Sequence, residues 1–221
     1  GPGVEARFYL PAAMAIDSDG AIYVADSQND RVRRVEPDGT VTTAAGAGSG
    51  FQDGPADQAL FSAPGGLALD GQGGLLVSEW GNNAVRRVDL ALGVVSTVTG
   101  NGQAGFVDGT LAEARFDRPG AVAVDPGTGL IYVADDWNNS IRVVNVAGDR
   151  VTTLAGTGEA GFADGPGGRQ GTAQFFHPLG VAVDGQGGVY VADYENQVIR
   201  YISPAGIVST LAGQPGNNFY R

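Results

Sequence analysis

The sequence of 221 residues contains no cysteine and a single histidine, His177. The lack of cysteine excludes disulfides and thiolate metal sites. One histidine cannot supply the several ligands of a catalytic zinc site. No run of the sequence approaches the ~18 apolar residues of a membrane-spanning helix, so we expect no membrane insertion.

Basic residues are also scarce: 13 Lys and Arg stand against 24 Asp and Glu, for a net charge of −11. Basic groups dominate affinity for phosphate backbones, so we expect no nucleic-acid partner. The chain is 43% hydrophobic and 17% charged, which is typical of a globular protein. The start, Gly1-Pro2-Gly3, shows no signal peptide and resembles a remnant of protease cleavage, which leaves the compartment open, with a slight preference for an extracytoplasmic bacterial location.

One short phrase occurs four times along the chain: Tyr23-Val24-Ala25-Asp26, Leu76-Val77-Ser78-Glu79, Tyr132-Val133-Ala134-Asp135 and Tyr190-Val191-Ala192-Asp193. The acidic residues that end these phrases are 53, 56 and 58 positions apart. A period of this length indicates a repeat architecture. Residues that recur in every copy are expected to serve the repeat, so function is sought where the copies differ.

Each repeat holds four short runs rich in β-branched residues, separated by Gly, Asn, Asp and Pro turns, which predicts an antiparallel meander. The runs are almost continuously apolar, so both faces of each sheet are expected to be covered. Sheets stacked in this way form a β-propeller. We predict an all-β, four-bladed propeller in one domain over 1–221, with blades at about 8–46, 61–100, 116–156 and 175–213. The alternatives are a fragment of a larger, for example six-bladed, propeller or a ring completed by oligomerisation, so the chain is either a monomer or a self-associated ring.

The chain resembles the NHL-repeat β-propellers through the pattern Pro-x-Gly-x-Ala-x-Asp, Gly-x-x-Tyr-Val-Ala-Asp and Asn-x-x-Ile-Arg. The clearest copies run over 119–142 and 178–200. The Asn of the family pattern falls on Asn29, Asn82, Asn138 and Asn196. The histidine that gives the family its name is replaced by Asp30, Asn83, Asn139 and Gln197. The long connections are similar to those of bacterial members. The resemblance implies a propeller fold, and relatives include zinc-dependent lyases and calcium-dependent lactonases.

Four carboxylates at the ends of the second strands form one candidate metal site: Asp26, Glu79, Asp135 and Asp193. Gathered near the axis, they could hold calcium, which takes oxygen ligands. The favoured interpretation is structural, because an arginine recurs on the next strand of each copy and buried charges are usually paired. Those arginines are Arg33, Arg86, Arg142 and Arg200. Calcium is therefore an optional cofactor, and no other cofactor is expected.

Three aromatics in the loops after the second strands do not follow the repeat: Trp80, Trp137 and Tyr194. Aromatic residues supply large contact areas, so these are the predicted ligand-binding residues, with packing between neighbouring loops as the alternative. Phe51, Phe106 and Phe162, each two residues before an Asp-Gly pair, are expected to hold the long connections against the blades. His177 is interpreted as a structural residue.

The function predicted from these features is a non-enzymatic binding or scaffold module that presents loop aromatics to a protein or glycan partner. One alternative is a calcium-dependent hydrolase, lactonase-like or lyase-like enzyme. Another is a structural segment of a larger propeller protein.

Overall fold

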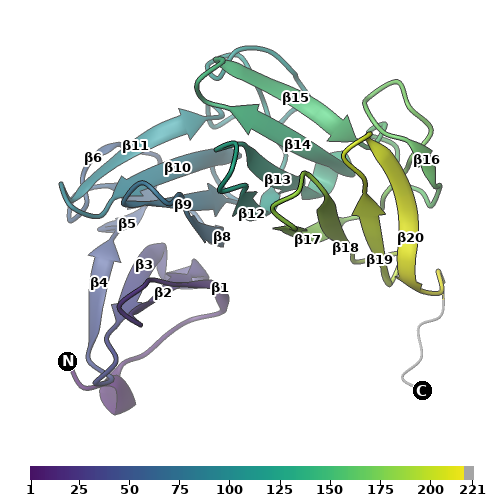
Figure 1. The fold of residues 1–221 in the computed structure, drawn as a ribbon. Helices are drawn as coiled ribbons and strands as arrows, with labels where there is room; N and C mark the ends of the chain where they lie inside the picture. Colours follow the sequence, from purple (N-terminus) through teal and green to yellow (C-terminus); the bar gives the residue numbers. More distant parts are fainter. Residues whose placement is uncertain (217–221) are drawn as a thin grey trace.

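The computed structural model describes residues 1–216 and contains four antiparallel sheets of successive strands (Figure 1). Each sheet is one repeat, and we call them blades 1 to 4. The strands of blade 1 are β1 (Pro11–Ile16), β2 (Ile22–Asp26), β3 (Arg31–Val35) and β4 (Val41–Ala45). Those of blade 2 are β8 (Pro64–Leu69), β9 (Gly74–Glu79), β10 (Ala84–Asp89) and β11 (Val94–Thr99).

Blades 3 and 4 repeat this order. Blade 3 consists of β12 (Pro119–Val124), β13 (Ile131–Asp135), β14 (Ser140–Asn145) and β15 (Arg150–Ala155). Blade 4 consists of β17 (Pro178–Val183), β18 (Val189–Asp193), β19 (Val198–Ile202) and β20 (Ile207–Gly213). The predicted all-β propeller of four meander blades is confirmed. Among the described residues, the helical segments are three 3₁₀ turns, η1 (Gly3–Glu5), η2 (Ser27–Asn29) and η3 (Asp136–Asn138), and none is long and apolar enough to cross a membrane.

The connections between blades add short edge strands. β6 (Gly54–Pro55) pairs with β11, and β16 (Gly165–Pro166) pairs with β20. β5 (Gly48–Ser49) and β7 (Leu60–Phe61) form a small parallel pair of their own. In blade 3, Gly109 takes the same edge position by exchanging two backbone hydrogen bonds with Val151.

Gly1 and Pro2 occupy this edge position in blade 1. Gly1 and Val41 exchange two backbone hydrogen bonds of 2.9 Å, and Pro2 lies opposite Thr40. The register is that of Gly54 with Val95 in blade 2. Two of the three residues that resemble a cleavage remnant, Gly1 and Pro2, therefore pair with the outermost strand of blade 1.

The hydrophobic core lies between the blades. The cluster between blades 1 and 2 joins Tyr23 and Val32 of the first to Leu75 and Val77 of the second, all nearly inaccessible to solvent. Equivalent clusters fill the other two junctions. Burial of large apolar side chains contributes about 1.5–3 kcal/mol each, so the stacking of blades supplies most of the stability.

The blades follow one another along an arc, with blades 1 and 4 at its two ends and not in contact as neighbours (Figure 1). Side chains at the two ends are accordingly exposed. Met14 on β1 is 70% exposed, whereas its counterparts Leu67 and Val122 are 8% and 5% exposed. On β19, Ile199 is 41% exposed, whereas its counterpart Ile141 in blade 3 is fully buried.

Candidate functional site

The four recurring carboxylates each belong to a network inside their own blade. Asp26, Glu79, Asp135 and Asp193 are all inaccessible to solvent. Each forms an ion pair with the arginine of the next strand, at 3.1, 3.0, 2.7 and 2.8 Å respectively. The pairing that the sequence predicted is present in every blade. Within residues 1–216, no group of three or more Asp, Glu, His or Cys side chains is placed to hold a metal ion.

Blade 3 shows the complete network. The guanidinium of Arg142 donates to Asp135 at 2.7 Å and to Asp108 of the preceding connection at 2.7 Å. It also donates to the carbonyl oxygens of Val107 and Arg115, at 2.8 and 3.0 Å. Two phenylalanine rings enclose it, Phe106 at 5.1 Å and Phe116 at 5.0 Å from the ring centroids. A charge taken out of water in this way is stabilised because its two terminal NH₂ groups bind two carboxylates and two carbonyl oxygens, and because the rings on both sides attract the cation.

Blades 2 and 4 reproduce this arrangement. Arg86 pairs with Asp53 and Arg200 pairs with Asp164, and the side chains of both arginines are fully buried. The same aspartates accept hydrogen bonds from the backbone N–H and hydroxyl of a threonine on the outermost strand, Thr97, Thr153 or Thr210. The sequence predicted that the phenylalanines hold the connections. It missed that the aspartates two residues later bind the buried arginines, although both recur in three copies.

Burial dominates the electrostatics of the carboxylates. It raises the pKa of Glu79 to about 7, although Arg86, Ser62 and Asn82 stabilise the charged form. Burial likewise raises the pKa of Asp135 to about 6 against the opposing effect of Arg142. It also raises the pKa of Asp193. The pKa of a carboxylate rises when the loss of hydration destabilises its charged form by more than its hydrogen-bond and ion-pair partners stabilise it.

The three predicted ligand-binding aromatics lie in different environments. Trp137 is 50% and Tyr194 59% exposed. Trp80 is only partly exposed, and its indole lies so close to Gly65 that a side chain at that glycine would collide with it. The backbone N–H of Trp137 donates to the carbonyl of Asp117, two residues before the proline that begins the innermost strand of blade 3, and the N–H of Gly81 makes the same bond to Ser62 in blade 2. Trp137 therefore stands one position later in its loop than Trp80 and points outward.

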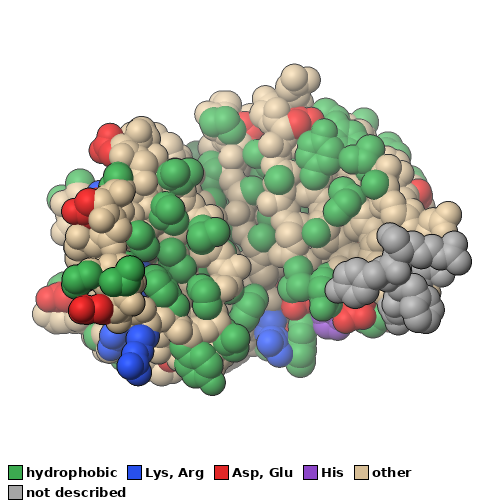
Figure 2. Space-filling view, turned by 90° about the horizontal axis from the view of Figure 1, so that it is seen from below, with side chains coloured by type: hydrophobic (Ala, Val, Ile, Leu, Met, Phe, Trp, Pro, Cys, Tyr) green, Lys and Arg blue, Asp and Glu red, His purple; other side chains and the backbone are tan. Residues whose placement is uncertain are grey.

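Trp137 belongs to a mixed cluster at the junction of blades 3 and 4. The guanidinium of Arg118 lies 4.6 Å from the centroid of its ring, and His177 meets it edge-on at 6.3 Å. Nδ1 of His177 lies 2.7 Å from Asp136, whose pKa is raised by burial. Figure 2 shows the single histidine, in purple, among basic, acidic and hydrophobic side chains on the surface. We call the surface formed by these loops and the starts of the innermost strands the loop face.

Comparison with known proteins identifies the repeat. The family profile "NHL repeat" matches residues 175–200, within blade 4. The chain is an NHL-repeat β-propeller. It is 35% identical over 156 residues to NHL repeat-containing protein 2 of Bos taurus, which covers 66% of this chain. It is 32% identical over 151 residues to Protein SUPPRESSOR OF QUENCHING 1, chloroplastic, of Arabidopsis thaliana, which covers 64% of this chain.

The NHL propeller described here is shorter than these proteins. The alignments cover 21% and 14% of the two relatives. Among solved structures, an auxiliary nutrient binding protein from Bacteroides ovatus superposes with a TM-score of 0.65 at 21% sequence identity. That superposition covers 90% of this chain and 48% of the other, so the arc has the fold of about half of that protein.

In this chain, the residues at the position of the histidine after which the NHL family is named connect neighbouring blades. Asp30, Asn83 and Asn139 have left-handed backbone conformations, with φ of 53°, 49° and 47°. Their side-chain oxygens accept hydrogen bonds from the backbone N–H of Ala63, Arg118 and His177, the residues just before the next innermost strand. Short polar side chains tolerate this conformation and bond to nearby backbone, which explains why they replace the family's histidine.

Proposed function

We propose that this NHL propeller is a non-enzymatic binding module whose loop face captures a protein or glycan through the aromatics at the junction of blades 3 and 4. The exposed indole of Trp137, flanked by Arg118 and His177, carries the proposal. The ring is half exposed although two side chains pack against it. Tyr194, which is 59% exposed, extends the aromatic surface onto blade 4.

The chemistry of this cluster suits a partner with both apolar and polar groups. An exposed indole offers a flat surface for a sugar ring or an apolar side chain. Arg118 and His177 place hydrogen-bonding groups beside it, and Asp136 limits the rotation of the imidazole through a 2.7 Å contact. A preorganised site of this kind loses little conformational entropy on binding. The name of the Bacteroides ovatus neighbour, a nutrient binding protein, supports a binding role at the level of the fold.

The test uses the intrinsic fluorescence of the chain, which contains two tryptophans, Trp80 and Trp137. A Trp80→Phe variant leaves Trp137 as the reporter. Screening it against oligosaccharide and peptide panels should reveal ligands that shift or quench its emission. A ligand found in this way should bind the Trp137→Ala variant at least tenfold more weakly, because aromatic anchors at the centre of a contact commonly contribute more than 1 kcal/mol.

Matched controls separate binding from folding. Leu92→Ala removes an exposed side chain from the turn between β10 and β11, away from the loop face, and should leave binding unchanged. The thermal midpoint of Trp137→Ala should stay within about 2 °C of the parent, because half of the ring already contacts water. Unfolding of this variant, or unchanged affinity for every ligand found, would refute the proposal.

A further inference from the structure

The second strand of blade 2 lacks an aromatic residue that the other three blades share. The phrase that ends each second strand begins with Tyr23, Tyr132 and Tyr190 in blades 1, 3 and 4, but with Leu76 in blade 2. Tyr23 and Tyr132 are 4% and 6% exposed and belong to the clusters that fill the junctions of blades 1 and 2 and of blades 3 and 4. At the junction of blades 2 and 3, the smaller side chain of Leu76 takes this position.

A pocket of about 330 Å³ lies at this junction, beside Leu76. Its lining includes Gln72 and Gly129, which belong to turns between first and second strands, so it opens on the side of the blades opposite the loop face. An apolar cavity of about 150 Å³ already accommodates benzene, and this pocket therefore has room for a substituted ring. Its apolar wall is formed by five side chains: Leu76, Val98, Leu111, Val124 and Ile131.

Val146 at the rim of the pocket shows what the missing ring leaves uncovered. It lines the pocket and is 50% exposed. Its counterpart at the junction of blades 1 and 2 is Leu90, which packs against the cluster that contains Tyr23. An aromatic ring in the pocket would thus cover an apolar side chain that is now in contact with water.

Blade 1 shows which polar groups surround the tyrosine hydroxyl. Tyr23 lies opposite Arg34 in the sheet, and the guanidinium is 5.9 Å from the centroid of its ring. Arg34 also pairs with Asp17 and Glu36. Burial lowers the pKa of Arg34, but the tyrosine and the two carboxylates together raise it above its ordinary value. The ring therefore ends beside an arginine that two carboxylates hold in place.

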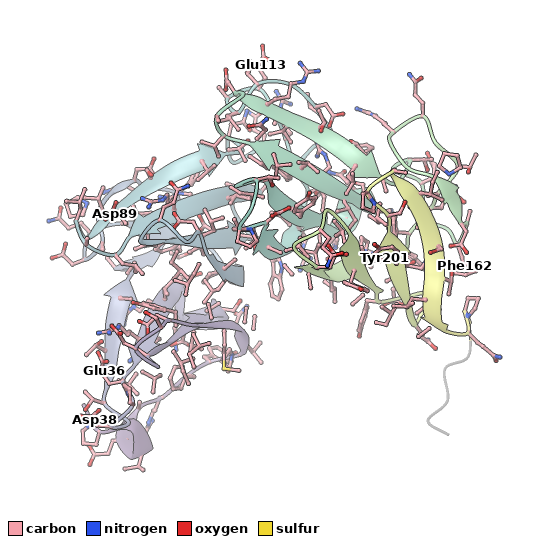
Figure 3. All side chains as sticks on the ribbon, viewed as in Figure 1. Glu36, Asp38, Asp89, Glu113, Phe162 and Tyr201 are labelled. Carbon is pink, nitrogen blue, oxygen red and sulfur yellow. The ribbon has the colours of Figure 1, made fainter. Side chains whose placement is uncertain are left out.

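Blade 2 repeats these charges without the ring. Leu76 lies opposite Arg87, whose guanidinium pairs with Asp70 at 2.7 Å and with Asp89 at 3.0 Å. Figure 3 labels Asp89 at the end of β10 and its counterpart Glu36 just after β3. Among the described residues, Nη2 of Arg87 makes one hydrogen bond, a long one of 3.4 Å to the carbonyl oxygen of Gln72. This nitrogen has capacity to donate to a further oxygen.

Tyr132 of blade 3 indicates a second partner for a hydroxyl at this position. Its pKa is raised by burial and by Asp125 and Asp184, which follow the innermost strands of blades 3 and 4. The corresponding aspartates near the pocket are Asp70 and Asp125. A hydroxyl can accept from the arginine and donate to a carboxylate, whereas an anionic group would be repelled by the aspartates.

We propose that the pocket between blades 2 and 3 binds a small neutral phenol, whose ring takes the place that a tyrosine side chain fills in blades 1 and 3. The ring contacts Leu76 and Ile131 and covers Val146. The hydroxyl accepts from Nη2 of Arg87 and donates to Asp70. The site lies on the opposite side of the blades from Trp137, so it is independent of the function proposed above.

The test titrates the full chain with p-cresol, which is the side chain of tyrosine, and follows the backbone amides by NMR. The amides of Leu76, Val98 and Val124, around the pocket, should shift and reach saturation. Two matched probes define the chemistry: toluene lacks the hydroxyl, and 4-methylbenzoate carries a negative charge. Both should bind at least about tenfold more weakly, because each loses a hydrogen bond to a charged group or meets like charge.

Leu76→Tyr places the ring of the repeat inside the pocket and should abolish the shifts caused by p-cresol. Its thermal midpoint should not fall below that of the parent, since the same side chain fills this position in blades 1 and 3. Ile207→Ala, which removes an exposed side chain from blade 4, should leave binding unchanged. Absence of shifts around the pocket in the parent, or binding that survives Leu76→Tyr, would overturn the proposal.

Arg87→Met tests the recognition of the hydroxyl without altering the apolar wall. The side chain of Arg87 is 27% exposed, so its replacement leaves the core between the blades in place. The affinity for p-cresol should fall to that for toluene, and the affinity for toluene should stay the same. Equal binding of p-cresol and toluene by the parent, or a preference for p-cresol that persists in Arg87→Met, would show an apolar cavity without phenol recognition and overturn the proposal.

Discussion

Replacing the repeated arginine by alanine should lower the free energy of unfolding much more in blade 3, at Arg142, than in blade 1, at Arg33. Arg142→Ala leaves Asp135 fully buried with no cation beside it and removes the ion pair that holds Asp108. Removing one partner of a buried pair costs about 3–5 kcal/mol, because the remaining charge stays desolvated. The two phenylalanine rings also lose the cation between them.

Arg33→Ala removes weaker interactions than Arg142→Ala does. Arg33 is partly exposed, and two of its hydrogen bonds, to Arg7 and Thr42 carbonyls, are long at 3.4 Å. Asp26 keeps two contacts from the Asn29 amide and one from the Tyr9 backbone. Water can enter beside it, so we expect a cost of about 1 kcal/mol, near the value for a partly exposed pair.

Urea denaturation followed by far-ultraviolet circular dichroism measures both variants against the parent at pH 7. The expected difference between them is at least about 2 kcal/mol, a large fraction of the 5–15 kcal/mol typical of whole domains. If Arg142→Ala does not fold, Asp108→Asn reports on the same network with a smaller loss. Equal losses for the two arginine variants would refute the reasoning that the connection creates the buried network.

Two further predictions concern the carboxylates and the glycines. Because the pKa of Glu79 is raised in the folded chain, from 4.5 to about 7, the folded state binds the extra proton and the stability that Glu79 contributes is lost as pH rises between these values. Relative to Glu79→Gln, the parent should lose roughly 1–3 kcal/mol of unfolding free energy from pH 5 to 8 in urea titrations; parallel pH profiles would contradict this. Gly66→Ala places a Cβ 2.6 Å from the Gly120 carbonyl oxygen, so blades 2 and 3 must separate at a cost of about 1–3 kcal/mol. Gly48→Ala, which meets nothing within 4 Å, is the control, and equal melting temperatures of the two variants would show that the blades yield freely.

The blades could be predicted from the sequence because their determinants are local. β-branched runs, turn glycines and prolines before the innermost strands lie within one repeat, and their periodicity specifies the meander. The ion pair between Asp135 and Arg142 was also predictable, since the two residues are seven positions apart on adjacent strands.

Contacts between distant positions were missed. Asp108 reaches Arg142 across 34 residues, and nothing within one repeat indicates that a connection caps the next blade. The environments of the aromatic side chains could not be predicted from the sequence either. Trp80 and Trp137 occupy the same kind of loop, but a one-residue offset and the small Gly65 place one indole against the sheet and the other in solvent.

The hydrogen bonds that join neighbouring blades at the left-handed turns have a consequence for how the sequence of such a protein can evolve. The residue before each innermost strand is fixed through its backbone N–H, as at Ala63, Arg118 and His177. Its side chain is not part of that bond, so it can vary without disturbing the stacking, provided that it tolerates a positive φ. New recognition chemistry can therefore be introduced on the loop face one position at a time, while the scaffold that orients it stays the same. The row of Leu10, Ala63, Arg118 and His177 shows four different side chains on one conserved backbone geometry.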